Sequence, residues 1–300
     1  MDVSIIIVNY NTKELTAQCI ESIFEKTSGV TFEVIVVDNA SSDGSQEFFS
    51  EDPHIIFVEA GENLGFGRAN NKGLELASGK YVFFLNSDTV LVNNAVKSFF
   101  EYCESNSEKK IGAVGCLLEN YSGVYVHSFG YFPSTSSLLG GFFFAGIRKM
   151  FHMRSKPVGV NIEGEEQYVD YVTGADMFVL RNVVSKYGSF DPDFFMYYED
   201  TELQKRWSRE GLNNVIIRTP RIIHLEGCST KDRKHVLNER KLCMGLTSQR
   251  VYFKKTKSKI GYCLYRVFAV VNLLPIVCFK YNFRQIGMIC KIVFGKEKYV

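Results

Sequence analysis

Residues 1–120 alternate short, β-branched apolar runs with segments of helical periodicity. The apolar runs are Val3–Val8, Glu33–Val37, Ile55–Val58 and Tyr81–Leu85. Unbroken apolar runs of this length are typical of parallel strands that are buried on both faces, and the segments between them have room for crossover helices. The pattern therefore predicts an α/β domain with a doubly wound, mostly parallel sheet and helices on both faces.

Polar side chains stand at the carboxyl ends of these strands. Asn9 and Asp38 follow the first two strands, and Asn86 and Asp88 follow the fourth. Ligands of doubly wound sheets bind beyond this edge, where a carboxylate can accept a hydrogen bond from a nucleobase or a ribose hydroxyl. A second carboxylate nearby favours a divalent cation, since Mg²⁺ is commonly held by one or two carboxylates and by substrate phosphates. The alternative is that Asp and Asn only end the strands, because both favour turns.

A glycine-containing loop is predicted over Leu64–Arg68, ahead of a helix over Ala69–Ala77. The loop includes G-x-G, but the dinucleotide fingerprint should follow the first strand, where Asn9–Glu14 has no glycine. This argues against a Rossmann dehydrogenase. The loop backbone can still approach a ligand closely, and Arg68 is a candidate phosphate ligand. A plain glycine turn beside a surface arginine stays open as the alternative.

Two further groups carry candidate chemistry. Glu199 and Asp200 begin a predicted helix, where one carboxylate can act as general base for a hydroxyl while its partner tunes it. Carboxylates also occur at helix starts because they complement the dipole and cap the backbone, so a structural role remains open. His224 follows a predicted strand over Asn214–Ile217, in a short polar loop that favours a metal or phosphate contact; a structural histidine is the competing interpretation.

Composition restricts the class of protein. The chain has 300 residues, of which 46% are hydrophobic and 23% charged, so disorder is excluded. Its 8 cysteines are widely spaced and form no C-x-x-C pair, which indicates free thiols in a reducing cytosol rather than a disulfide scaffold or a zinc site. The N-terminus lacks the basic start and the long apolar stretch of a signal peptide. These features predict a cytoplasmic location.

The C-terminal region, residues 231–300, is strongly basic. It holds 16 Lys+Arg against 3 Asp+Glu, whereas the rest of the chain holds 19 against 30. Its stretch Ile260–Phe279 has about the length of a membrane span but is interrupted by Arg266, Asn272 and Pro275. A spanning helix and a surface-lying segment are both open, and the interruptions favour the second. The apolar content favours an anionic membrane surface, rather than nucleic acid, as the partner of this region.

Seven segments, taken in order along the chain, carry a family resemblance. They are VSIIIVNYN, VVDNASSDGS, NLGFGRANNKGL, YVFFLNSDTV, VDYVTGADMFVLRN, FDPDFFMYYEDTELQKRW and HLEGCS. In this order they resemble inverting glycosyltransferases of family 2, and more narrowly the bacterial rhamnosyltransferase-like branch. With a late segment at 248–255, the resemblance covers about residues 3–255. It implies a GT-A fold, a nucleoside-diphosphate sugar donor, a divalent cation (Mg²⁺ or Mn²⁺) and a glycan or lipid-linked saccharide acceptor.

The resemblance assigns roles to residues on the donor side. Asn9 and Asp38 match the positions that hold the nucleoside, and Arg68 lies in the loop beside the nucleotide. Asn86-Ser87-Asp88 matches the D-x-D metal motif, with Asp88 as the retained carboxylate. Because Asn86 stands in place of the first aspartate, the site has one charge fewer, and the diphosphate is expected to supply most metal ligands.

The resemblance also assigns residues near the acceptor. Asp176 lies in the strand on the acceptor side. Glu199 and Asp200 match the acidic pair that contains the base, with Asp200 as the first choice and Glu199 as the second. His224 matches the histidine that can complete the metal or diphosphate site.

Together these implications predict transfer of a sugar, with rhamnose from dTDP-rhamnose as the best guess, to a hydroxyl of a cell-surface glycan precursor with inversion. Residues 1–230 are expected to form the catalytic domain, with the nucleotide-sugar half over about 1–117 and the acceptor half over about 118–230. The aromatic stretch Phe142–Phe144 in the second half bears on the acceptor. Residues 231–300 are expected to form a basic helical extension on the inner face of the cell membrane. A sugar-1-phosphate nucleotidyltransferase and a catalytically silent glycan-assembly scaffold are the competing functions.

Overall fold

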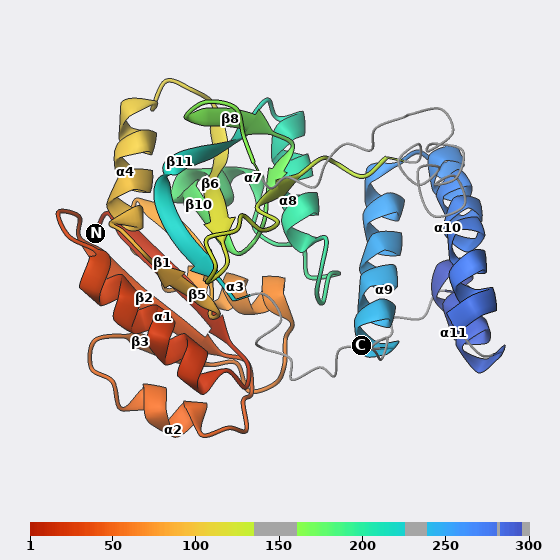
Figure 1. The fold of residues 1–300 in the computed structure, drawn as a ribbon, viewed down its shortest axis with the longest axis horizontal. Coiled ribbons are helices and arrows are strands. Elements are labelled where there is room, and N and C mark those ends of the chain that lie inside the picture. Colours follow the sequence, from red (N-terminus) through yellow and green to blue (C-terminus); the bar gives the residue numbers. More distant parts are fainter. Residues whose placement is uncertain (135–160, 226–238, 281–282, 296–300) are drawn as a thin grey trace.

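A computed structural model describes residues 1–134, 161–225, 239–280 and 283–295 of the chain (Figure 1). The strands are β1 (Val3–Asn9), β2 (Phe32–Asp38), β3 (Ile56–Glu59), β4 (Tyr81–Asn86), β5 (Thr89–Leu91), β6 (Ile111–Glu119), β7 (Phe129–Gly130), β8 (Glu166–Val169), β9 (Tyr171–Val172), β10 (Asp176–Leu180) and β11 (Asn213–His224). The helices are α1 (Lys13–Lys26), α2 (Ser45–Ser50), α3 (Phe66–Leu74), α4 (Ala95–Ser105), α7 (Arg181–Tyr187), α8 (Glu199–Arg209), α9 (Glu239–Thr256), α10 (Lys259–Lys280) and α11 (Phe283–Phe294). The stretch Phe142–Phe144 lies outside the described residues.

One mixed sheet organises the fold, and it confirms the predicted α/β class. Its strand order is β3-β2-β1-β4-β10-β6-β11-β5, and β8 pairs with β11 beside this path. The strands β3, β2, β1 and β4 are parallel to one another, and so are β6 and β11. Between these two groups β10 runs antiparallel to both of its neighbours. The carboxyl ends of β1, β2 and β4 meet at one edge, because Asn9 is opposite Asp38 and Val8 is opposite Asn86.

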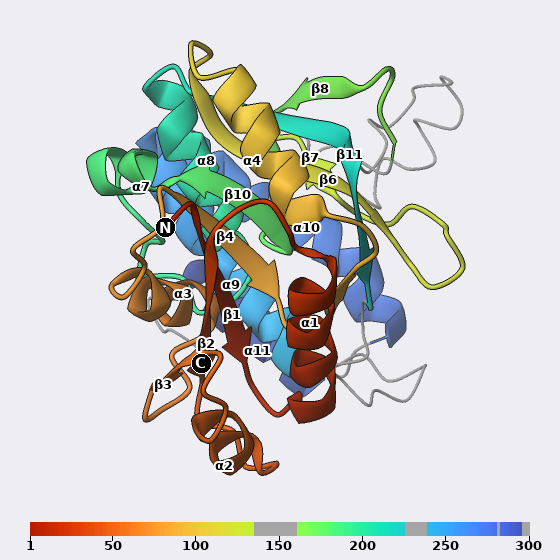
Figure 2. The ribbon, with the colours of Figure 1, turned by 90° about the vertical axis from the view of Figure 1, so that its left-hand side faces the viewer.

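Both faces of the sheet are buried, each under its own layer of helices. Along β1, Ile5 and Ile7 belong to one apolar cluster and Ile6 to the other, as the alternation of side chains along a strand requires. Helices α1 and α4 pack into the first cluster, and α3, α7 and α8 pack into the second. Figure 2 shows these two groups on opposite sides of the sheet. An unbroken apolar run is therefore favourable in β1, because water reaches neither of its faces.

The C-terminal helices α9, α10 and α11 form a further layer, with α9 nearest to the sheet-bearing part (Figure 1). Their apolar cluster includes Tyr252, Tyr265 and Ile292, and it also includes Phe194, which precedes α8. The three helices are therefore packed onto the rest of the molecule through a shared core. No helix in the described part of the chain combines the length and the apolar character that a membrane crossing needs.

The start of α3 differs from the sequence prediction. The helix begins at Phe66, so Arg68 belongs to its first turn rather than to a loop, and the predicted boundary at Ala69 is wrong. The helix starts early because the Phe66 backbone N–H is held by the carbonyl oxygen of Phe195, 2.9 Å away. Gly65 permits this approach, since its φ is +79° and a Cβ there would lie 2.1 Å from the same oxygen.

Candidate active site

Asn9 and Asp38 lie together at the carboxyl ends of β1 and β2. The Asn9 side-chain amide donates to Asp38 Oδ1 at 2.8 Å, and both residues are buried. The other Asp38 oxygen accepts from the Ser41 backbone N–H at 2.9 Å and from the Gln46 amide at 3.0 Å. Asp38 thus fixes the loop between β2 and α2, at the edge where the family resemblance predicts that the nucleoside binds.

Asn39 is a further polar residue at this edge, and sequence reasoning missed it. Its amide group donates to Asn63 Oδ1 at 3.0 Å and to the Gly65 carbonyl at 3.3 Å, while its oxygen accepts from the Leu64 N–H at 2.8 Å. Asn39 therefore sets the loop that precedes α3. The neighbouring Arg68 donates through Nε to the Leu64 carbonyl at 2.8 Å. An Asn directly after a strand-ending Asp was the signal that the sequence offered.

The end of β4 meets the end of β11, and this contact brings Asn86, Asp88 and His224 together. His224 is opposite Thr89 in the register of β11 with β5. Its Nε2 lies 3.3 Å from Asp88 Oδ1 and 3.3 Å from the Asn86 amide nitrogen. The side chains of His224 and Asp88 are only 11% and 10% exposed. The structure thus brings together three residues that are far apart in the sequence.

These residues fit a divalent cation that is shared with a substrate. Asp88 offers a carboxylate oxygen and His224 an imidazole nitrogen, and their 3.3 Å separation resembles the roughly 3 Å between adjacent ligands of an ion with ligand distances of about 2.1 Å. The described residues contain no group of three or more His, Cys, Asp or Glu side chains placed to hold a metal. A cation bound by Asp88 and His224 would therefore need further ligands from a substrate such as a diphosphate.

Asp176 begins β10 and lies inside the sheet rather than on an exposed face. It is completely buried, and its Oδ2 accepts from the Cys116 backbone N–H at 2.6 Å. The other oxygen, Oδ1, is buried without a hydrogen-bond partner. Burial raises the pKa of Asp176 to about 7. The antiparallel insertion of β10 between β4 and β6 places this carboxyl there.

Glu199 and Asp200 form the first turn of α8 and point in different directions. A Cβ added at Gly174 would lie 3.6 Å from the Asp200 Cβ, whereas one added at Gly67, in α3, would lie 3.6 Å from the Glu199 Cβ. Asp200 therefore faces the turn between β9 and β10, and Glu199 faces α3. The helix geometry that separates adjacent residues by about 100° accounts for this difference.

The two carboxyl groups also differ in their partners. Asp200 Oδ2 accepts from the Gly174 N–H at 2.9 Å, and Oδ1 accepts from the Thr201 N–H at 2.6 Å. Glu199 is 5% exposed, and its Oε2 has no hydrogen-bond partner. Burial, reinforced by the Asp200 charge, raises the pKa of Glu199 to about 8. Burial also raises the pKa of Asp200, but the N–H donors from Gly174 and Thr201 oppose that rise. Asp200 thus has backbone donors that stabilise its ionised form, whereas Glu199 Oε2 has no hydrogen-bond partner.

A short segment links the acidic pair to the Asn86–Asp88 edge. Gly174 donates its N–H to Asp200, and the carbonyl of the next residue, Ala175, accepts from the Asn86 N–H at 3.0 Å. Asp200 and Asn86 therefore form hydrogen bonds with two adjacent residues, Gly174 and Ala175, of the same turn. One rigid connection sets the acidic pair relative to the candidate metal ligands.

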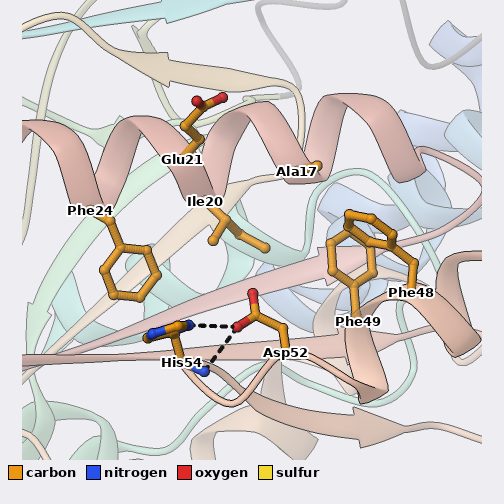
Figure 3. Close-up of a pocket in the computed structure, with 8 residues that line it drawn as sticks. All are labelled: Ala17, Ile20, Glu21, Phe24, Phe48, Phe49, Asp52 and His54. Atoms are coloured by element: carbon orange, nitrogen blue, oxygen red, sulfur yellow. Dashed lines mark hydrogen bonds and ion pairs between the residues drawn. The ribbon is translucent and has the colours of Figure 1, made fainter.

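A cavity of about 450 Å³ lies elsewhere, between α1 and α2 (Figure 3). It is lined by Ala17, Ile20, Glu21, Phe24, Phe48, Phe49, Asp52 and His54. His54 Nδ1 lies 3.0 Å from Asp52 Oδ1 at its rim. The lining includes none of the candidate site residues, so this cavity is separate from the site.

Comparison with known proteins agrees with this arrangement. Residues 4–123 match glycosyl transferase family 2. The matched segment contains the donor-side residues from Asn9 to Asp88, with the strands β1, β2 and β4 and the helix α3 that position them.

Two curated relatives extend the similarity further along the chain. The low-salt glycan biosynthesis hexosyltransferase Agl10 of Haloferax volcanii is 28% identical over 216 residues, which cover 71% of this chain and 63% of that protein. The N-acetylglucosaminyl-diphospho-decaprenol L-rhamnosyltransferase of Mycobacterium tuberculosis is 24% identical over 214 residues, covering 66% of this chain and 67% of that protein. The match to the hexosyltransferase thus spans less than two thirds of its length.

A solved structure shares the fold. The mannosyltransferase PcManGT from Pyrobaculum calidifontis, in complex with GDP-Man and Mn²⁺, aligns with a TM-score of 0.56 at 14% sequence identity. The alignment covers 96% of this chain and 78% of that one. The predicted GT-A fold is therefore confirmed.

Proposed function

We propose that the chain is an inverting, metal-dependent glycosyltransferase that moves a sugar from a nucleoside-diphosphate donor to a hydroxyl of a cell-surface glycan precursor. The observation that supports this proposal is the connection through Gly174 and Ala175, which joins the Asp200 carboxylate to Asn86, two residues before Asp88 of the Asp–His pair. In this proposal residues 1–117 bind the donor and residues 118–230 bind the acceptor.

The proposed reaction is a single displacement. Asp200 takes the proton of the acceptor hydroxyl, and the hydroxyl oxygen attacks the anomeric carbon from the face opposite the nucleotide. The bond from that carbon to the diphosphate oxygen breaks, and the diphosphate leaves with the electron pair. Its negative charge faces Arg68 and the edge that carries Asp88 and His224. A divalent cation held there supplies positive charge for the departing diphosphate.

A raised pKa at Asp200 is consistent with a base, because a carboxylate that binds protons more tightly is the stronger proton acceptor. The two backbone N–H groups that Asp200 accepts keep its carboxylate in one orientation. Because Oδ1 also accepts from the Thr201 hydroxyl at 3.1 Å, Oδ2 is the oxygen that retains a lone pair for the hydroxyl proton. Glu199, with its pKa at about 8, is protonated at neutral pH and is the weaker candidate.

We expect dTDP-rhamnose to be the donor that the protein turns over fastest, with inversion at the anomeric carbon. The rhamnosyltransferase similarity supports this choice of sugar. The measurement is release of nucleoside diphosphate across a panel of nucleotide sugars, followed by NMR of the glycoside formed. A retained configuration contradicts the mechanism. Formation of a nucleotide sugar from a sugar 1-phosphate and a nucleoside triphosphate, without transfer, supports a nucleotidyltransferase instead.

The proposal extends to an anionic membrane surface on the inner face of the cell membrane, where a lipid-linked acceptor resides. On α10 the side chains Ile260, Leu264 and Val267 are 75%, 45% and 54% exposed. Their spacing puts them on one face of the helix, away from the buried Tyr265 and Ala269. The surrounding region carries a large excess of Lys and Arg. Exposed apolar side chains beside cations favour the surface of anionic lipids.

We expect the double variant Ile260→Ser and Leu264→Ser to bind phosphatidylserine-containing vesicles at least roughly tenfold more weakly than wild type, because each side chain contributes about 1.5–3 kcal/mol on burial. Vesicle cosedimentation measures the change. Phe48→Ser is the matched control, since Phe48 is 53% exposed but lies beside the cavity between α1 and α2. Equal vesicle binding by wild type and the double variant contradicts membrane docking. A double variant that loses self-association, but not vesicle binding, contradicts it as well.

A further inference from the structure

Two consecutive residues before the acidic pair have an unusual backbone. Tyr197 and Tyr198 have φ of 70° and 66°, in the left-handed region. This conformation costs a residue with a side chain on the order of 1 kcal/mol or more, and it persists only where the surroundings enforce it. Tyr198 is the N-cap residue directly before α8, and its carbonyl accepts the Glu202 N–H at 2.8 Å. The strained turn therefore sets where Asp200 lies.

The contacts that enforce this turn come from α9. Ser248 Oγ donates to the Met196 carbonyl at 2.7 Å. The Gln249 amide donates to the Tyr198 hydroxyl oxygen at 2.9 Å, and Gln249 Oε1 accepts from the Tyr265 hydroxyl at 3.4 Å. Gln249 thus links the turn to both α9 and α10.

Aromatic packing and charge reinforce the same contact. The Tyr198 and Tyr252 rings lie 5.4 Å apart. Lys255, in the last turn of α9, forms ion pairs with Asp191 at 2.5 Å and with Asp193 at 2.8 Å. The segment between these aspartates and Tyr198 includes Phe194, which is fully buried in the cluster of α9, α10 and α11. The segment ahead of α8 is therefore fixed to the C-terminal helices along its length.

The opposite side of this segment contacts the donor-side loop. The Phe195 carbonyl accepts the Phe66 N–H at the start of α3. The turn is thus held between α3, which carries Arg68, and α9. Removing the contacts with α9 frees one side of the turn while leaving the contact with α3 in place.

We propose that α9 positions the acidic pair for the transfer reaction, with Gln249 and Ser248 as the positioning residues. The C-terminal helices are then part of the catalytic apparatus, in addition to any role at a membrane. This inference rests on the proposed glycosyl transfer. In the proposed reaction Asp200 accepts a hydrogen bond from the Gly174 N–H and also receives the proton of the acceptor hydroxyl, so its position is tightly constrained. A displacement of about 1 Å can lower the rate roughly 100-fold.

The test uses the full-length chain with the variants Gln249→Leu, Gln249→Glu and Ser248→Ala. Gln249→Leu removes both hydrogen bonds, whereas Gln249→Glu can still accept from the hydroxyls of Tyr198 and Tyr265. Thr256→Val is the matched control, because the Thr256 hydroxyl donates only within α9, to the Tyr252 carbonyl. Two quantities are measured: amide hydrogen exchange at residues 197–202, and kcat and KM for the donor.

We expect Gln249→Leu to exchange faster at residues 197–202 and to lose about 10–100-fold in kcat, with donor KM unchanged. Ser248→Ala follows with a smaller loss, while Gln249→Glu and Thr256→Val stay near wild type. Unchanged exchange in Gln249→Leu overturns the role of α9 whatever the activity. Faster exchange with unchanged kcat overturns the positioning role. A wild type that transfers no sugar refutes the proposed function, and the exchange data still decide whether α9 holds the turn.

Discussion

Asp200→Asn is expected to abolish most sugar transfer while donor binding survives. The amide has the shape of the carboxylate and can still accept from the Gly174 or Thr201 N–H, so the turn keeps its support. It cannot take the proton of the acceptor hydroxyl. General base catalysis typically contributes about 10²–10⁴-fold, and we expect kcat to fall by that factor. Nucleotide release measures kcat, and calorimetry measures the donor Kd.

Glu199→Gln is the matched control, because it makes the same change one residue away. Glu199 is protonated below about pH 8, so a neutral amide in its place should leave the acidic limb of the pH–rate profile unchanged. Transfer requires ionised Asp200, and the rate therefore rises with pH through that limb. If Glu199→Gln lowers kcat as far as Asp200→Asn does, the base is assigned to the wrong carboxylate.

The stability of the same control gives an independent check. The folded chain keeps Glu199 protonated up to about pH 8, whereas its ordinary pKa is 4.5. A raised folded-state pKa stabilises the fold at low pH, and this contribution is lost as the pH rises from about 4.5 through about 8. We therefore expect the Tm of Glu199→Gln to fall less than that of wild type over this range.

Local patterns predicted the first half of the fold well. The four predicted strands begin and end within one residue of the observed positions, whereas β5 and β6, which also lie within residues 1–120, were not predicted. The agreement has a physical cause: a short, unbroken apolar run is buried on both faces only when it forms a central strand of a covered sheet. The common location of the polar residues that end β1, β2 and β4 could also be predicted, since parallel strands bring their carboxyl ends to the same edge.

Long-range contacts explain what the sequence could not predict. The early start of α3 depends on the Phe195 carbonyl, which is 129 residues away from Phe66. The left-handed turn at Tyr197 and Tyr198 has no glycine to mark it, and its support comes from Gln249 in a distant helix. Local periodicity contains neither kind of information.

Asp176 and His224 show the same limit within the site. Residues 176–180 have an ordinary strand pattern, and only the antiparallel insertion between β4 and β6 makes the Asp176 carboxyl fully buried. The strand that leads to His224 is longer than the predicted Asn214–Ile217, and its pairing with β5 brings the histidine to Asp88. The family resemblance, rather than periodicity, predicted that His224 and Asp88 belong to one site.

Asp88→Asn is expected to weaken binding of Mn²⁺, measured in the presence of a nucleoside diphosphate, by at least roughly 10–100-fold. Loss of an outer-shell partner alone typically costs that much, and in the proposed site Asp88 would be a direct carboxylate ligand. Transfer should fall in parallel. Paramagnetic resonance of free Mn²⁺ measures the binding without relying on activity, and His224→Ala should weaken it less because the anionic ligand remains.

Asp52→Asn provides the matched control for this prediction. Asp52 also faces a histidine, with His54 Nδ1 at 3.0 Å, but the pair lies at the rim of the cavity between α1 and α2. The His54 side chain is 74% exposed, whereas those of Asp88 and His224 are 10% and 11% exposed. An exposed pair leaves a cation fully hydrated, so its loss should not change Mn²⁺ binding. If Asp52→Asn weakens binding as much as Asp88→Asn, or if neither does, the cation is not held at the end of β4.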